Sequence, residues 1–227
     1  FIKKKTVVVK ISKNKKLLNE DFEASKQLNS IKSPNYSKYL GLFSCKDDIK
    51  NYSKSKPLPE EFCKLNGETN FFLFMPYYKL GSLAVYVPKN IDEIISIINQ
   101  FICASLFAYQ KLGFLHNDLH IGNILFSVTK KEYIFYNLNN LFFKVPTFGF
   151  MVKIIDWGRG TYNYNNIIGK NNIFMPGREC ENQIIFNRFN KRERLHYKWT
   201  DIVIFVQNLI FNKPILRKFP KFYTFLQ

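Results

Sequence analysis

Residues 114–126, with the sequence FLHNDLHIGNILF, decide how the rest of the chain is interpreted. Polar side chains at positions 116, 118, 120 and 123 lie between apolar residues that can anchor the segment at both ends. Asp118 and Asn123 stand five residues apart on this loop. An isolated acid in a turn is usually a cap, but this pair places a carboxylate beside a hydroxyl nucleophile and an amide oxygen beside a metal ion. The segment therefore predicts a catalytic loop.

A second polar group follows at residues 153–158, KIIDWG. The apolar run ahead of Asp156 predicts a strand that delivers the carboxylate to its end, and Gly158 allows a sharp turn after it. Magnesium is usually bound by one or two carboxylates and shares its shell with phosphate oxygens. Asp156 is therefore a candidate Mg²⁺ ligand.

Composition bounds the class of protein. The chain has 227 residues, and its 46% hydrophobic content excludes a wholly disordered chain. No apolar run reaches the roughly 18 residues that suggest a spanning helix, and the first residues do not form a secretory signal, so we expect no membrane segment. The formal net charge of +17 supports an anionic ligand only weakly. Lysine is abundant here together with Asn, Ile, Phe and Tyr, as an AT-rich coding sequence would produce.

Four cysteines are spread along the chain without a CxxC pair or a His/Cys cluster: Cys45, Cys63, Cys103 and Cys180. They are too sparse for a disulfide scaffold, and a zinc site is not expected. We expect buried thiols in a reducing compartment, and thus an intracellular protein of the cytoplasm or nucleus.

The hydrophobic pattern predicts a small β-rich part followed by a mainly helical part. The clearest element is a helix that Asn90 caps, with Glu93 three residues on, and that ends at Gly113. Strands are expected at 6–11, 39–45, 71–75 and 152–155 and around a loop at 133–150, helices at 20–31 and 201–211, and a surface loop at 46–69. This order favours an α+β fold with a ligand cleft between two lobes.

The two polar segments resemble the catalytic loop, His-Arg-Asp-Leu-x4-Asn, and the metal-binding Asp-Phe-Gly motif of the protein kinase-like superfamily. The resemblance spans nearly the whole chain. It implies a two-lobed fold with an incomplete N-lobe at 1–75, a hinge at 76–83 and a mainly helical C-lobe at 84–227. It also implies ATP and Mg²⁺ as cofactors and a protein hydroxyl as acceptor, in a kinase of serine/threonine type.

The resemblance assigns chemical roles to several side chains. Asp118 would orient the acceptor and take its proton, and Asn123 and Asp156 would hold Mg²⁺ against the phosphates. Lys10, at the end of a Val-Val-Val strand, would neutralise phosphate charge. Glu23, on the following helix, would be the ion-pair partner of Lys10.

Further positions follow from the same resemblance. His120 replaces the lysine that serine/threonine kinases usually present near the γ-phosphate, and is kept as a catalytic candidate. Met75 and Tyr77 lie in the strand and hinge whose backbone would meet adenine. Three residues would have structural roles: His116, Gly158 and Asp201, of which Asp201 would open a central helix and steady the catalytic loop.

The chain departs from the family pattern in ways that leave alternatives open. His-x-Asp-Leu-His-x-Gly-Asn and Ile-Asp-Trp are similar to aminoglycoside- and choline-type kinases, so a small-molecule kinase is the runner-up. No glycine-rich segment precedes Lys10, which keeps open a pseudokinase that serves as a nucleotide-binding scaffold. We expect no nucleic-acid partner, because no basic–aromatic cluster stands out.

The two ends and one insertion also differ from the family. Both ends of the family domain are missing by this interpretation, so we expect the chain to be a fragment of a longer protein. The interval between Asn123 and Asp156 is long, which indicates an insertion at 133–150. Such insertions recur in divergent protozoan and viral kinase-like proteins, and a viral protein of this kind would act in the host cell.

Regulation by phosphorylation gives a first prediction. Asn117 stands where many regulated kinases have the Arg that pairs with a phosphate on the activation segment, and residues 162–199 contain no Ser or Thr. Treatment with a Ser/Thr phosphatase should therefore leave any phosphotransferase activity unchanged. An enzyme that loses its activity after this treatment would argue against the interpretation.

Overall fold

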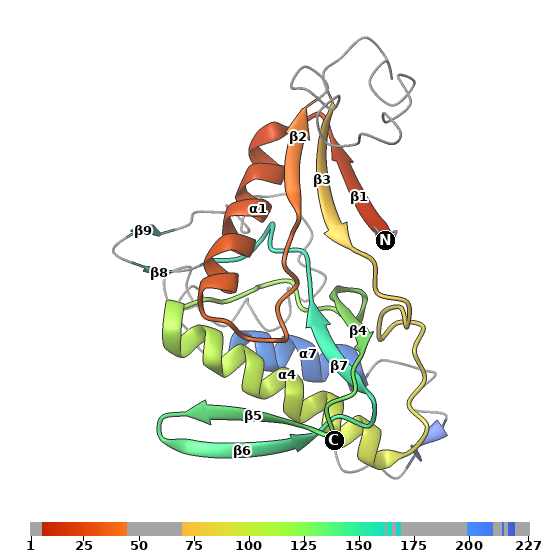
Figure 1. Cartoon of the computed structure of the whole chain (residues 1–227). Helices are drawn as coiled ribbons and strands as arrows, with labels where there is room; N and C mark the ends of the chain where they lie inside the picture. The colour runs from red at the N-terminus through yellow and green to blue at the C-terminus, as the bar shows by residue number, and fades with distance from the viewer. Residues whose placement is uncertain are drawn as a thin grey trace.

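A computed structural model describes residues 6–44, 70–161, 163–164, 167–168, 199–210, 215 and 218–220. Its elements are β1 (Val7–Ser12), α1 (Lys15–Ser30), β2 (Gly41–Ser44), β3 (Phe71–Pro76), α4 (Ile91–Leu112), the 3-10 turn η2 (Ile121–Asn123), β4 (Ile124–Val128), β5 (Tyr133–Leu138), β6 (Leu141–Pro146), β7 (Phe150–Ile154), β8 (Asn163–Tyr164), β9 (Ile167–Ile168) and α7 (Thr200–Ile210). They form an α+β fold with two lobes, as the sequence predicts (Figure 1).

The smaller lobe is an antiparallel sheet in the order β1-β3-β2, with α1 packed beside it (Figure 1). The hydrophobic run of β3 places Phe72 and Leu73 in the core, and Lys10 of β1 pairs with Leu73 in the register. Helix α1 begins five residues earlier than expected, because the side chain of Asn14 accepts a hydrogen bond from the N–H of Leu17 and caps it there.

Helix α4 is the central element of the larger lobe and agrees with its predicted bounds. The Asn90 side chain accepts from the Glu93 N–H at 2.9 Å, and Gly113 ends the helix at a φ of 58°. The helix is long and apolar enough to cross a membrane by length and composition alone, but 56% of its apolar window is buried inside the protein. Its contacts with α1, α7 and three strands are those of a core helix.

The two lobes are joined through β7. Tyr36, which follows α1, forms an isolated parallel bridge with Ile154, and the N–H of Ile154 donates to the carbonyl of Asn35 at 2.8 Å. The Tyr36 hydroxyl donates to the carbonyl of Ala104 in α4 at 2.8 Å. The segment after α1 is therefore bonded both to the strand that leads into Asp156 and to the central helix.

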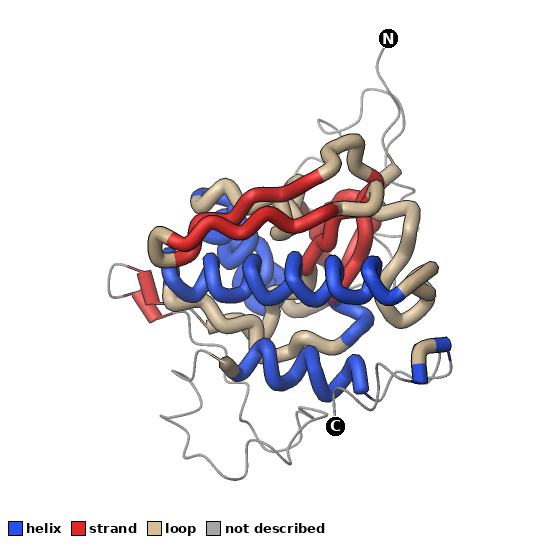
Figure 2. The backbone as a smooth tube through the Cα atoms, turned by 90° about the horizontal axis from the view of Figure 1, so that it is seen from below, coloured by secondary structure: helices blue, strands red, loops and turns tan. Residues whose placement is uncertain are grey.

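The predicted insertion is a β-hairpin formed by β5 and β6. Asn139 and Asn140 take φ values of 50° and 66° in its turn, a conformation that Asn tolerates well. Residues on its inner face pack against α4 around Cys103, and the hairpin runs along this helix (Figure 2). Its outer face exposes Phe135 and Phe142.

Cys103 is a buried free thiol, as predicted for the cysteines, and burial raises its pKa to about 11. The remaining three cysteines lie outside the described residues, as do the predicted loop at 46–69 and most of the segment at 162–199.

The end of α4 provides a test of the fold. Gly113→Ala should lower the free energy of unfolding by about 1–2 kcal/mol, because an L-residue is strained in the left-handed conformation. Asn99→Ala, at an exposed position within the same helix, is the control and should change stability by less than about 0.7 kcal/mol. Urea denaturation would measure both, and equal effects of the two substitutions would contradict the assigned cap.

Candidate active site

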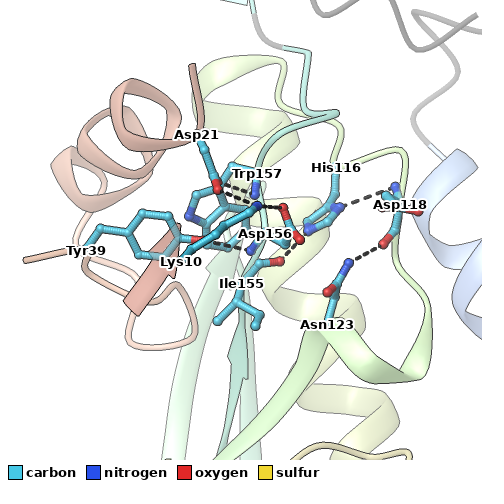
Figure 3. Close-up of polar contacts among 9 residues, drawn as sticks. All are labelled: Lys10, Asp21, Tyr39, His116, Asp118, Asn123, Ile155, Asp156 and Trp157. Carbon is cyan, nitrogen blue, oxygen red and sulfur yellow. Dashed lines mark hydrogen bonds and ion pairs between the residues drawn. The ribbon is translucent and has the colours of Figure 1, made fainter. Parts of the chain in front are cut away.

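His116 connects the loop at 114–126 to the strand that leads into Asp156. Its Nε2 lies 2.7 Å from the carbonyl oxygen of Ile155, and its Nδ1 lies 3.3 Å from the N–H of Asp118. A carbonyl can only accept and an N–H can only donate, so the proton is on Nε2. With its side chain buried, His116 fixes the two loops against each other (Figure 3).

Asp201, in the first turn of α7, is hydrogen-bonded to the backbone of the same loop. Its Oδ2 accepts from the N–H of His116 at 2.7 Å and its Oδ1 accepts from the N–H of Asn117 at 2.9 Å. Burial raises the pKa of Asp201, although hydrogen bonds from two backbone N–H groups oppose that rise. The carboxylate thus satisfies two backbone donors that the turn would otherwise leave unpaired.

Asp118 and Asn123 are brought together at the turn of the loop. The side-chain amide of Asn123 donates to the backbone carbonyl of Asp118 at 2.9 Å. The Ile155 N–H donates to the backbone carbonyl of Asn123 at 3.1 Å. The amide nitrogen is therefore engaged, and the amide oxygen is the atom that could face a cation. The Asp118 carboxylate is 25% exposed and forms an ion pair with Arg159.

Asp156 follows β7 and takes the left-handed conformation, with a φ of 65°. Its N–H donates to the Tyr39 hydroxyl at 2.8 Å, and its Oδ1 lies 2.8 Å from the Nζ of Lys10. Burial raises the pKa of Asp156, but the charge and hydrogen bond of Lys10 outweigh that effect and hold it below its usual value.

Lys10 bridges two carboxylates, those of Asp156 and Asp21. Its Nζ lies 3.0 Å from Asp21 Oδ2. Burial lowers the pKa of Lys10, yet the two neighbouring carboxylates outweigh this and raise it above its ordinary value. For Asp21 itself burial dominates, so its pKa is raised despite the nearby ammonium.

The prediction that Glu23 forms the ion pair with Lys10 is wrong. Glu23 lies on the outer side of α1, where it forms a surface ion pair with Lys26 at 2.6 Å. Asp21 falls instead on the buried stripe with Leu18 and Leu28. The sequence held this signal: residues three and seven apart along a helix share a face, and Asp21 has that spacing from Leu18 and Leu28.

Asp21 also holds the Asp-Trp-Gly segment. Its Oδ1 accepts from the N–H of Trp157 at 2.7 Å, and the Trp157 ring packs against aromatic side chains that include Tyr36 and Phe114. Trp157 is fully buried. One side chain of α1 therefore orients both Lys10 and the residue after Asp156 (Figure 3).

Asn117 faces inward. It takes a φ of 63°, and its amide donates to the carbonyls of Leu115 and Arg159 and to the Thr161 hydroxyl. These bonds join the loop at 114–126 to the start of the segment after Gly158. A buried amide thus stands at the position for which the family resemblance implies a phosphate-binding arginine.

Other predicted positions lie apart from this network. Met75 is half-buried in β3 opposite Val8, and Tyr77 is largely exposed after the strand. The contacts of these residues leave their proposed role at adenine untested, and it stays a prediction. His120 caps the turn η2: its Nδ1 accepts from the Gly122 N–H at 3.1 Å.

The donors present fit a magnesium ion shared with a nucleotide. No group of three or more His, Cys, Asp or Glu side chains that could hold a metal occurs among the described residues. Asp156 offers one carboxylate and Asn123 one amide oxygen. Magnesium needs few protein ligands when phosphate oxygens complete its shell, and this pair is of that kind.

Comparisons with known proteins agree with the sequence resemblance. No family model matches the chain. A probable serine/threonine-protein kinase of Dictyostelium discoideum is 31% identical over 144 residues, which are 59% of this chain and 11% of that protein. The serine/threonine-protein kinase haspin of Mus musculus is 39% identical over 62 residues, 27% of this chain and 8% of haspin. The chain therefore spans only a small part of these relatives.

A solved structure is also similar. The Cydia pomonella granulovirus kinase PK-1 is 17% identical, with a TM-score of 0.44, over 71% of this chain and 45% of that one. The two sequence relatives confirm the predicted resemblance to the protein kinase-like superfamily. At the level of the family, the chain is similar to phosphotransferases of the protein kinase type.

The two acidic residues of α1 can be compared directly. Asp21→Ala should lower the free energy of unfolding by about 1–3 kcal/mol, because it leaves the buried N–H of Trp157 without an acceptor. Glu23→Ala removes only an exposed ion pair and should change stability by less than about 0.5 kcal/mol. Urea denaturation of both variants decides between them, and a larger effect of Glu23→Ala would restore the original pairing.

Proposed function

We propose that the protein containing this chain transfers the γ-phosphoryl group of ATP, with Mg²⁺, to a hydroxyl group of a protein. Support comes from the convergence of three distant segments on one place. Lys10 of β1 contacts Asp156, and His116 joins the Asp156 strand to the loop that carries Asp118 and Asn123. Each of these side chains is of the type that phosphoryl transfer needs.

The residues of the chain would divide the work as follows. Asp118 orients the acceptor hydroxyl and takes its proton as the new phosphorus–oxygen bond forms and the bond to ADP breaks. Lys10 binds the α- and β-phosphates, which compete with Asp156 for its ammonium group. Asp156 and Asn123 would hold Mg²⁺, which when bound neutralises charge on the phosphates. Positioning of this kind supplies most of the rate enhancement in phosphoryl transfer.

A small-molecule acceptor is the second candidate. It is favoured by the histidine at position 120, which the aminoglycoside- and choline-type kinases share. ATP is an intracellular nucleotide, and we propose the same location for this protein.

Phosphoryl transfer can be measured with γ-labelled ATP and Mg²⁺. We expect the wild-type protein to label casein, and Asp118→Asn to lower the rate by roughly 10²–10⁴-fold, because the positioned base is lost. Asp118→Asn should leave ATP binding unchanged, whereas Asp156→Asn should weaken binding of Mg²⁺-ATP and abolish transfer.

Two comparisons make this assay specific. Asp92→Asn, on the exposed first turn of α4, carries the same chemical change away from the site and should retain full activity. Choline and kanamycin are offered as separate acceptors, and label in either one would favour the small-molecule kinase. A wild-type protein that binds ATP but labels nothing would leave the nucleotide-binding scaffold as the function.

A further inference from the structure

Arg159 contacts the side chain proposed as the catalytic base. Its Nη1 lies 3.2 Å from Asp118 Oδ1, and the two side chains are 30% and 25% exposed. The contact joins the loop at 114–126 to the residue immediately after Gly158. It is a charge-assisted hydrogen bond, which is stronger and more directional than a neutral one.

The backbone of Arg159 is held on both sides, so its side chain starts from a fixed point. The Asn117 amide donates to the Arg159 carbonyl at 3.1 Å. The Gly160 N–H donates to the Trp157 carbonyl at 2.8 Å and closes a turn around Arg159. Trp157 is in turn fixed by Asp21.

His120 does not contact Asp118 through its ring. Its Nδ1 accepts from the Gly122 N–H, and while it does so the imidazole is neutral. The ring lies so close to Gly122 that a Cβ added there would be 2.8 Å from His120 Cε1. The side chain expected to stand near the γ-phosphate therefore packs on its own turn.

Lys10 is engaged at the other end of the site. Its ammonium pairs with Asp21 and Asp156, whereas Asp118 pairs with Arg159. A phosphoryl group that approaches Asp118 would meet a carboxylate of like charge. A cation beside that carboxylate reduces the repulsion and fixes the direction of its oxygens.

We propose that Arg159 is a positioning residue for Asp118 and takes the place that His120 would fill by family resemblance. Arg159 holds Oδ1, so that Oδ2 faces the acceptor hydroxyl and receives its proton. The guanidinium stays protonated throughout and exchanges nothing with the substrates. The proposal rests on the proposed function, because it assigns a role within the same transfer.

The test compares the rate of transfer in variants of the whole protein, with whichever acceptor probe the wild type labels. Arg159→Ala should lower kcat by about 10²-fold, as expected for a misplaced catalytic group, with the KM for ATP unchanged. Added methylguanidinium should restore part of the rate, which a purely structural defect would not allow. Arg159→Lys keeps the positive charge but lacks the planar guanidinium, and its kcat should lie between those of the wild type and Arg159→Ala.

Three further variants complete the design. Lys131→Ala removes an exposed cation from a loop away from the site and should retain full activity. His120→Asn keeps an acceptor for the Gly122 N–H and should lose less activity than Arg159→Ala. Arg159→Gln, which is closer in length to arginine, carries the same comparison if the alanine variant does not fold.

The outcomes separate the two proposals. An active wild type with an undiminished or faster Arg159→Ala variant would overturn the role of Arg159 alone, and a faster one would identify the ion pair as inhibitory. A greater loss in His120→Asn than in Arg159→Ala would overturn it as well. An inactive wild type would overturn the proposed function, and with it this inference.

Discussion

The buried carboxylate of Asp21 is the constraint on which the arrangement of the site depends. Each of its oxygens is committed, one to the ammonium of Lys10 and the other to the N–H of Trp157. Burial disfavours this charge, and the two donors offset that cost only in part, because the pKa of Asp21 stays raised. Helix α1, strand β1 and the segment after β7 are therefore fixed relative to one another by one side chain. Removal of a single partner from such a group is more damaging than replacement of the whole group by apolar residues.

The loop at 114–126 is held by a second polar network, in which buried donors and acceptors have partners. Asp201 accepts from two consecutive backbone N–H groups, and Asn117 donates to three oxygens on both sides of the site. A fully satisfied buried network rigidifies the segment it contains. The shape of the loop is thus maintained by hydrogen bonds of Asn117 and Asp201. Position 117 holds an uncharged side chain, and not an arginine that could bind a phosphate group.

The sequence predicted what local rules control. Asn90 and Gly113 marked the ends of α4 because capping depends on neighbouring residues. That the two polar loops lie close together was predicted from their resemblance to two motifs of the protein kinase-like superfamily. Family spacing described neither the partner of Lys10 nor the direction of His120. The partner of Lys10 could have been predicted from the buried face of α1, because Asp21 lies three and seven residues from Leu18 and Leu28. The direction of His120 depends on a hydrogen bond within a short turn.

Trp157 also gives this molecule an optical property. Its indole is fully buried among Tyr36, Tyr39, Phe114 and His116, two hydrogen bonds away from Lys10 through Asp21, and its Nε1 has no hydrogen-bond partner among the described residues. The chain has only one other tryptophan, Trp199, which is partly exposed and lies elsewhere on the surface. Tryptophan fluorescence of the unlabelled protein therefore comes from one buried indole beside the candidate active site and one indole in contact with solvent. Differential quenching by acrylamide would separate the two signals, so occupancy of the site can be followed in solution without any attached dye.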